Sequence, residues 1–191
     1  MPRALATKAK IEAAALKLFA EKGVDQTTTR DIAAGAGISE GAIYRHFESK
    51  EALVHELFAA NYLRLAGEID ELQAQEEGLR GKLAAMVRAF CLLFEQDPDM
   101  FRFLLLVQHG ELRKLPPDSK TPVRVVREVI EAAIQRSEIP AQDPNVANAL
   151  VFGLVLQPAL FKVYGQIDQP MTALAERLTE ACWRTLSGLP E

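Results

Sequence analysis

The chain has 191 residues, of which 49% are apolar and 25% are charged, and its formal net charge is −4. This composition excludes a disordered or low-complexity chain and is typical of one or two packed globular domains. The first residues lack the charged-then-apolar layout of a secretory signal. The longest apolar stretch, residues 147–160, is interrupted by Asn148, Gln157 and Pro158. We therefore expect a cytoplasmic protein with no membrane-spanning helix.

The charge is divided unevenly along the chain. Residues 1–50 hold eight lysines and arginines against six acidic residues, which gives +2, and residues 51–191 carry −6. A cationic N-terminal end favours nucleic acid there, and the acidic remainder repels it.

Every periodic segment has the 3.6-residue repeat of a helix, and no run alternates with period two. The sequence therefore predicts an all-α fold of about nine helices. The first helix spans residues 7–21, buries Ile11 and Phe19, and ends at Gly23.

Residues 28–53, TTRDIAAGAGISEGAIYRHFESKEAL, contain two short helical patterns on either side of Gly37. Thr28 and Asp31 have the spacing of a capping box, and a glycine at 37 suits a left-handed turn. Ser39 is placed to cap a second helix over residues 40–46, in which Ile43 points to the core and the remaining positions face outward. This order predicts a helix-turn-helix unit whose second helix enters a DNA groove.

Further helices are predicted beyond this unit. Ser49 caps a helix that begins at Lys50 and runs into the sixties, and a polar stretch over residues 68–81 separates it from a helix at 83–94. Asp97-Pro98 begins a helix that is apolar nearly all round and must be buried on most sides. Residues 115–122 form a loop, and helices follow at 126–134, from Asp143 or Asn145 to 163, and at 171–186.

These residues closely resemble the DNA-binding domain of the TetR family of bacterial transcriptional regulators. The family's run of Thr-Thr, Ile-Ala, Ala-Gly, Tyr-x-His-Phe, Lys and Leu is matched without a gap, and KIEAAALKLFAEKGVDQTTT matches the family's first helix. The resemblance covers roughly residues 5–60. It implies a helix-turn-helix domain over residues 1–52, a ligand-sensing and dimerisation domain over 53–191, and a homodimeric regulator, most often a repressor.

The resemblance also implies two kinds of DNA contact. Tyr44, His46 and Lys50 match positions that hold the phosphate backbone, and Thr28 and Thr29 lie at a helix N-terminus that suits the same role. The predicted DNA-binding set is completed by Ser39 and Arg45. The alternative for Tyr44 is packing on the first helix, and for Arg45 it is an ordinary solvated ion pair.

Base contacts are expected from positions that match base-facing residues of the family, namely Arg30, Glu40, Gly41 and Ala42. Arg30 suits guanine and Glu40 suits the amino group of cytosine, although Glu40 also fits a solvated pair. Gly41 departs from the bulkier residues common there, so specificity at its base pair is expected to be weak.

A palindromic operator has two half-sites, so binding needs two helix-turn-helix units spaced roughly 34 Å apart. The apolar faces of the last two helices are candidates for a two-fold interface, and their alternative is the monomer core. These faces carry Phe152, Leu156 and Leu160 on one helix and Leu178, Cys182 and Leu186 on the other.

The helices after residue 52 hold more large side chains than a tight bundle requires, with a few polar groups among them, and Pro158 should kink its helix. Together with the family analogy this predicts a mostly apolar pocket for a small-molecule effector. Core packing is the alternative for each residue taken singly. The predicted lining is Phe90, Phe94, Met100, Phe101, Leu104, Gln108, His109, Gln157, Phe161 and Tyr164.

Other functions are less well supported by the sequence. Three histidines form no metal-ligand pattern, and no phosphate loop or nucleophile motif is present, so we expect no enzyme, cofactor or metal. A helical di-iron enzyme would require Glu-x-x-His pairs, which are lacking. An activator, a ligand-independent regulator and a protein-interaction module remain alternatives, although the last leaves the polar second helix without a purpose. Cys91 and Cys182 lie on apolar helical faces, which favours buried packing over a redox role. When bound to its operator, the protein is expected at the nucleoid.

Overall fold

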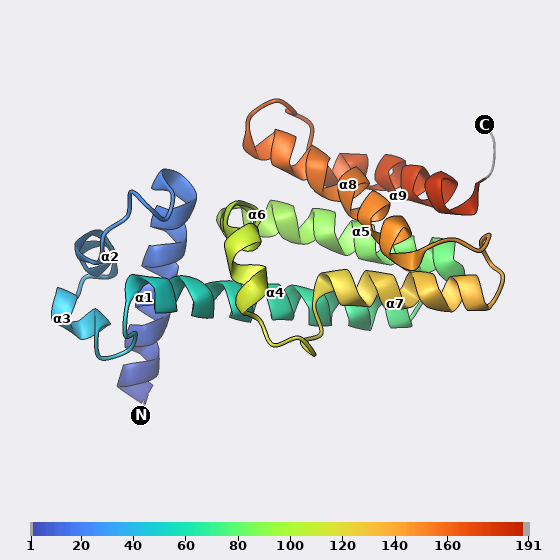
Figure 1. Cartoon of the computed structure of the whole chain (residues 1–191). Coiled ribbons are helices and arrows are strands. Elements are labelled where there is room, and N and C mark those ends of the chain that lie inside the picture. Colours follow the sequence, from blue (N-terminus) through green and yellow to red (C-terminus); the bar gives the residue numbers. More distant parts are fainter. Residues whose placement is uncertain (1, 189–191) are drawn as a thin grey trace. The chain divides into compact units, whose positions relative to one another are not determined.

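The computed structural model describes residues 2–188, with side chains from residue 5 onward (Figure 1). Over this range the chain forms nine α-helices and one 3-10 turn without any strand, which confirms the predicted all-α class. The elements are α1 Pro2–Lys22, α2 Thr29–Ala36, α3 Glu40–Ile43, α4 Lys50–Ala74, α5 Gly78–Gln96, α6 Pro98–Glu111, η1 Leu112–Lys114, α7 Pro122–Gln135, α8 Pro144–Val163 and α9 Met171–Ser187.

The helices group into two compact units. Unit 1 comprises residues 1–61 and 97–117, and unit 2 comprises residues 62–96 and 118–191. Unit 1 therefore holds α1 to α3, the start of α4 and all of α6, whereas the sequence suggested a division after residue 52. That functional boundary stays a prediction.

The core of unit 1 is built from side chains of all its long helices. Ile11 and Phe19 of α1 are buried with Ile32 of α2, and the Phe19 ring stacks on Phe103 of α6 with centroids 5.7 Å apart. The contact between Phe19 and Phe103 joins residues far apart in sequence, so α6 is part of the core beneath the first three helices. Leu106 on the opposite side of α6 is 45% exposed, so this helix is less enclosed than its composition predicted.

The predicted polar separator at 68–81 is wrong at both ends, because α4 continues to Ala74 and α5 begins at Gly78. Its residues are polar but are good helix formers, and an ion pair between Arg64 and Glu68 at 2.7 Å bridges successive turns. Only residues 75–77 separate α4 from α5.

Unit 2 is a helical bundle in which α5 packs along α9, and α7 lies against α5 and α8 (Figure 1). Cys91 of α5 and Cys182 of α9 are free thiols with no exposed surface. Burial raises the pKa of each thiol to about 11, which agrees with the predicted packing role.

Helix α8 has the length and composition of a membrane-crossing helix, whereas the sequence analysis expected no such helix. One of its faces is nevertheless in the protein core, because Val151, Val155 and Ala159 are buried in unit 2. Asp143 caps the helix through the Asn145 amide at 2.8 Å, as one of the two predicted starts required.

Candidate DNA-binding site

The site begins at the N-terminus of α2, where the predicted capping box is present. The Asp31 amide donates to the Thr28 hydroxyl at 3.1 Å, and the Thr28 amide donates to the Asp31 carboxylate at 3.0 Å. The hydrogen bond from the Thr28 amide is the main cause that holds the pKa of Asp31 below its usual value. The hydroxyl of Thr28 accepts from the Asp31 amide, and a side-chain hydrogen bond from Thr28 also lowers the pKa of Asp31.

A left-handed residue at Gly37, with φ of 67°, ends α2 as predicted. The following amide, from Ile38, donates back to Ala33 at 3.0 Å and closes the turn. At Gly35, α2 packs against α1: a Cβ there would lie 3.4 Å from the Cβ of Ala14, which is ordinary van der Waals contact.

Helix α3 is shorter than the sequence predicted. It covers Glu40–Ile43, and the chain then tightens, with the His46 amide donating to the Ile43 carbonyl at 2.8 Å. The tighter turn brings Phe47 into the core, where it is 2% exposed. Ser39 occupies the cap position, but its side chain forms no capping hydrogen bond, which differs from the expected role.

Residue 42 also differs from the prediction. Ala42 is 4% exposed and packs beside Ile43 in the core, so it does not face outward. Ala42 therefore belongs to the buried side of this short helix together with Ile43.

The outward surface is formed by side chains from both helices. Arg30, Glu40, Gly41 and Arg45 are exposed, Thr29 and His46 are half-buried, and Tyr44 is 53% exposed. The exposure of Tyr44 argues against packing on the first helix.

Thr29 links the two helices on this surface. Its hydroxyl donates to the Glu40 carboxylate at 2.6 Å and lies 3.4 Å from the Tyr44 hydroxyl. The partner of Glu40 is thus a hydroxyl of α2, which orients the carboxylate toward the α2–α3 surface. This arrangement presents one anionic acceptor among otherwise cationic or neutral groups.

Lys50, at the start of α4, is tied to the loop between α1 and α2. Its ammonium donates to the carbonyls of Val24 at 2.9 Å and Thr27 at 3.1 Å. An ammonium has three donors, so one remains for a phosphate. The carbonyl oxygens also offset the unfavourable position of a cation at a helix N-terminus. Ser49 caps α4 through the Ala52 amide at 3.1 Å, as predicted.

A charge cluster around the buried carboxylate of Glu111 was not found from the sequence. Glu111, at the end of α6, is 6% exposed, and its carboxylate lies 2.9 Å from His55 Nδ1 and 2.7 Å from Lys114 Nζ. No local pattern pairs His55 with a residue 56 positions away, so only the fold could bring them together. Among residues 2–188 no group of side chains could hold a metal ion.

The predicted effector-site residues divide between the two units. In unit 1, Met100, Phe101 and Leu104 are buried, Gln108 is half-buried and His109 is exposed. In unit 2, Phe90 and Phe94 are buried with ring centroids 6.4 Å apart, whereas Gln157 is exposed, Phe161 is 44% exposed and Tyr164 is 56% exposed. The exposed aromatic side chains lie on the surface of unit 2 and do not line an enclosed core cavity. The effector site as a whole stays a prediction.

Two helices at a glycine turn, with a buried inner face and a polar outer face, define a helix-turn-helix DNA-binding protein. The model of the bacterial regulatory proteins of the tetR family matches residues 11–57, which hold this unit. This segment is therefore similar to the DNA-binding part of that family of transcriptional regulators.

Curated relatives match mainly in the same region. The HTH-type transcriptional repressor KstR2 of Rhodococcus jostii is 44% identical over 73 residues, which is 38% of this chain and 36% of the relative. The chain thus matches about a third of that repressor's length. The fatty acid metabolism regulator protein of Bacillus subtilis is 24% identical over 176 residues, which cover 87% of this chain and 89% of the relative.

Solved structures share the whole fold. FadR from Bacillus subtilis, crystallised with stearoyl-CoA, superposes with a TM-score of 0.79 at 24% identity, covering 95% of this chain and 99% of that one. PfmR from Thermus thermophilus, a TetR family regulator, gives a TM-score of 0.74 at 20% identity and covers 91% of this chain and 97% of that one. At this identity the likeness establishes the fold alone.

Proposed function

We propose that the protein is a homodimeric repressor that binds a palindromic operator through α2 and α3 and is released by a small, largely apolar ligand. The α2–α3 surface is the observation that carries this proposal. Ile32 and Ile43 are buried beneath it, whereas Arg30, Tyr44 and Arg45 stand exposed on it. A stable core under a polar, partly cationic surface is what major-groove binding requires.

The proposed DNA contacts divide into phosphate contacts and base contacts. Hydroxyls and cations suit phosphate, and that group comprises Thr28, Thr29, Ser39, Tyr44, Arg45, His46 and Lys50. Ser39 fits because its hydroxyl is not used as a cap. Arg30 and Glu40 have exposed heads suited to guanine and cytosine edges, and Gly41 leaves open space beside them. Ala42 is omitted because it is buried.

A binding-site selection with the full-length protein and random duplexes tests this function. We expect a palindromic consensus, with an affinity that falls steeply as salt rises. A scrambled duplex of equal length is the control. Equal affinity for consensus and scrambled DNA would contradict sequence-specific regulation.

The proposed dimer rests on α8. Only 28% of an 18-residue apolar stretch of this helix is buried, and Val146, Leu150 and Phe161 on its outer side are 57%, 47% and 44% exposed. An apolar stripe of this length on one helix is unusual for a monomer and fits a self-complementary two-fold contact. Leu178, Cys182 and Leu186 of α9, which the sequence offered for the interface, are buried within unit 2. We therefore assign the contact mainly to α8.

Light scattering after gel filtration distinguishes dimer from monomer. Leu150→Glu should yield a monomer, because a carboxylate would be buried without a partner. Leu92→Glu is the matched control, since Leu92 on α5 is 51% exposed and lies outside the stripe. A monomeric wild-type protein, or equal loss in both variants, would overturn the assignment.

For the ligand, the full-length likeness to a fatty acid regulator supports an acyl thioester as the first probe. Phe90 and Phe94 give unit 2 a buried aromatic cluster suited to an apolar chain. Stearoyl-CoA should lower operator affinity, and coenzyme A alone should not. If no acyl thioester changes operator binding, this ligand class is wrong and the DNA-binding function still stands.

A further inference from the structure

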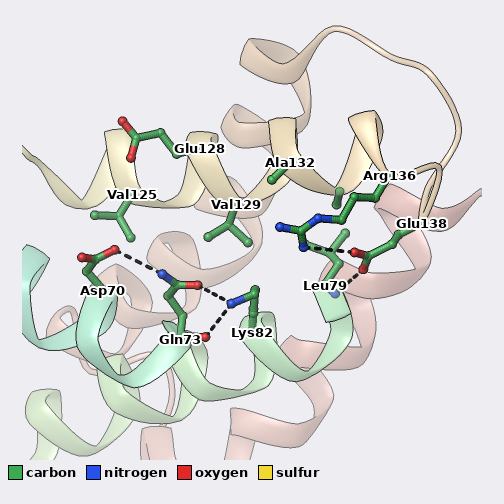
Figure 2. A pocket seen from close by; sticks show the side chains of 11 residues that line it. Asp70, Gln73, Leu79, Lys82, Val125, Glu128, Val129, Ala132, Arg136 and Glu138 are labelled. Atoms are coloured by element: carbon green, nitrogen blue, oxygen red, sulfur yellow. Dashed lines mark hydrogen bonds and ion pairs between the residues drawn. The ribbon is translucent and has the colours of Figure 1, made fainter. Parts of the chain in front are cut away.

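Unit 2 contains a pocket that lies among α4, α5 and α7 and has a volume of about 230 Å³ (Figure 2). Its apolar floor comes from buried side chains of two helices, with Leu79 on α5 and Val125 and Val129 on α7. Charged and amide side chains surround this floor. Asp70, Gln73 and Leu79 of its lining fall in the stretch predicted as a polar separator, and the other lining residues lie at or after Lys82, so no local pattern indicated the pocket.

Lys82 is the first unusual group in the pocket wall. Its ammonium donates to the backbone carbonyl of Gln73 at 2.8 Å and to the side-chain oxygen of Gln73 at 2.9 Å. The Gln73 amide nitrogen donates to Asp70 at 3.1 Å, which keeps its oxygen turned toward Lys82. Among the described residues no carboxylate lies within 4 Å of this ammonium, so a part-buried charge has only neutral acceptors and one donor left.

Arg136 is the second unusual group in the pocket wall. It lies across the pocket from Lys82, with its guanidinium below Ala132 (Figure 2). Its guanidinium forms an ion pair with one carboxylate oxygen of Glu138 at 3.6 Å, a distance too long for a hydrogen bond (Figure 2). The other oxygen of Glu138 accepts from the Leu79 amide at 2.6 Å and so caps α5. The planar donors of Arg136 are therefore largely unused.

The acidic groups of the wall are already neutralised. Asp70 pairs with Lys120, and Glu128 pairs with Arg124 at 2.8 Å. Glu138 is held at the positive end of α5. Among the described residues Lys82 is the wall charge without an ionic partner, and the exposed guanidinium of Arg136 has donors left beyond its 3.6 Å ion pair with Glu138, so both cations are available to an anion.

We propose that this pocket binds a short aliphatic carboxylate, with its carboxylate between Lys82 and Arg136 and its chain on the Leu79, Val125 and Val129 floor. A charge-assisted fork with Arg and a point charge from Lys is a strong combination for a carboxylate. The volume holds roughly eight groups of the size of water at about 30 Å³ each. That matches hexanoate and is below the roughly 300–1,000 Å³ of sites for larger ligands. The site does not depend on the proposed DNA-binding function.

Hexanoate is the probe, titrated into the full-length protein by calorimetry and followed by methyl NMR. We expect saturable binding with shifts at the methyls of Val125 and Val129. Hexan-1-ol should bind at least tenfold more weakly, because it lacks the charge. Inorganic phosphate should also bind at least tenfold more weakly, because it lacks the chain.

Lys82→Met and Arg136→Gln should each lower hexanoate affinity at least tenfold. Lys162→Met is the matched control, because Lys162 also donates to two backbone carbonyls, those of Asp168 and Gln169, but lies outside the pocket. Ala132→Leu fills the pocket without removing a charge and should also abolish binding. Thermal unfolding verifies that each variant is folded.

Several results would overturn the proposal. These are no shift at the Val125 and Val129 methyls with millimolar hexanoate, equal binding of hexan-1-ol or phosphate, or unchanged affinity in folded Lys82→Met and Ala132→Leu proteins.

Discussion

The most informative single change is Lys50→Met, which removes the charge and keeps most of the apolar stem. In the folded protein the ammonium forms hydrogen bonds of 2.9 Å and 3.1 Å with the Val24 and Thr27 carbonyls. A net hydrogen bond to a charged group contributes about 1.5–3 kcal/mol, and part-exposure of Lys50 places the pair of bonds near the lower end, at about 2 kcal/mol in total. For a chain of this size that corresponds to a fall in Tm of about 4–8 °C.

The same variant should change DNA binding in a defined way. The third donor of Lys50 is assigned to one phosphate, so its loss should reduce the slope of log K against log salt by about 0.9. The loss should be equal on consensus and scrambled duplexes, because a phosphate contact carries no base information.

Calorimetric unfolding and fluorescence anisotropy at several salt concentrations measure the two effects. The control is Lys17→Met, because Lys17 lies on α1 with its side chain 69% exposed and has only a 4.0 Å pair with Glu21. An unchanged Tm would refute the role of the carbonyl contacts. A full salt slope in Lys50→Met would refute the phosphate contact.

Three further predictions concern the turn, base recognition and the thiols. Gly37→Ala should lower the free energy of unfolding by about 1–2 kcal/mol, because φ is 67° there. No atom lies within 4 Å of the added Cβ, so the loss is purely conformational. Denaturant unfolding measures it, and Gly41→Ala should show no comparable loss. Arg30→Ala should cost about 1–3 kcal/mol on the consensus operator and relax one base position in a repeated selection, and an equal loss on scrambled DNA would contradict base reading. Cys91 and Cys182, with pKa values raised to about 11, should resist a thiol reagent at pH 8 until the protein unfolds. The reaction should accelerate as the pH approaches the pKa of the thiols. Rapid labelling of the native protein at pH 8 would contradict their burial.

Local signals in the sequence determined the helix-turn-helix unit. The Thr28–Asp31 capping box, the left-handed Gly37 and the caps at Ser49 and Asp97 are all as predicted. Each depends on residues no more than four positions apart, so a short stretch of sequence contains both partners of the interaction. The helical period likewise identified the all-α class without knowledge of any distant contact.

The tertiary structure decided which residues are available for function. Ala42 is buried and Tyr44 is exposed because the short α3 turns against a core built from other helices. Lys50 reaches carbonyls 23 and 26 positions away, and Glu138 caps α5 from 59 positions away. Such pairings depend on how helices pack, and neither helical period nor capping pattern encodes them. The pocket bounded by Lys82 and Arg136 exists only because these distant segments meet.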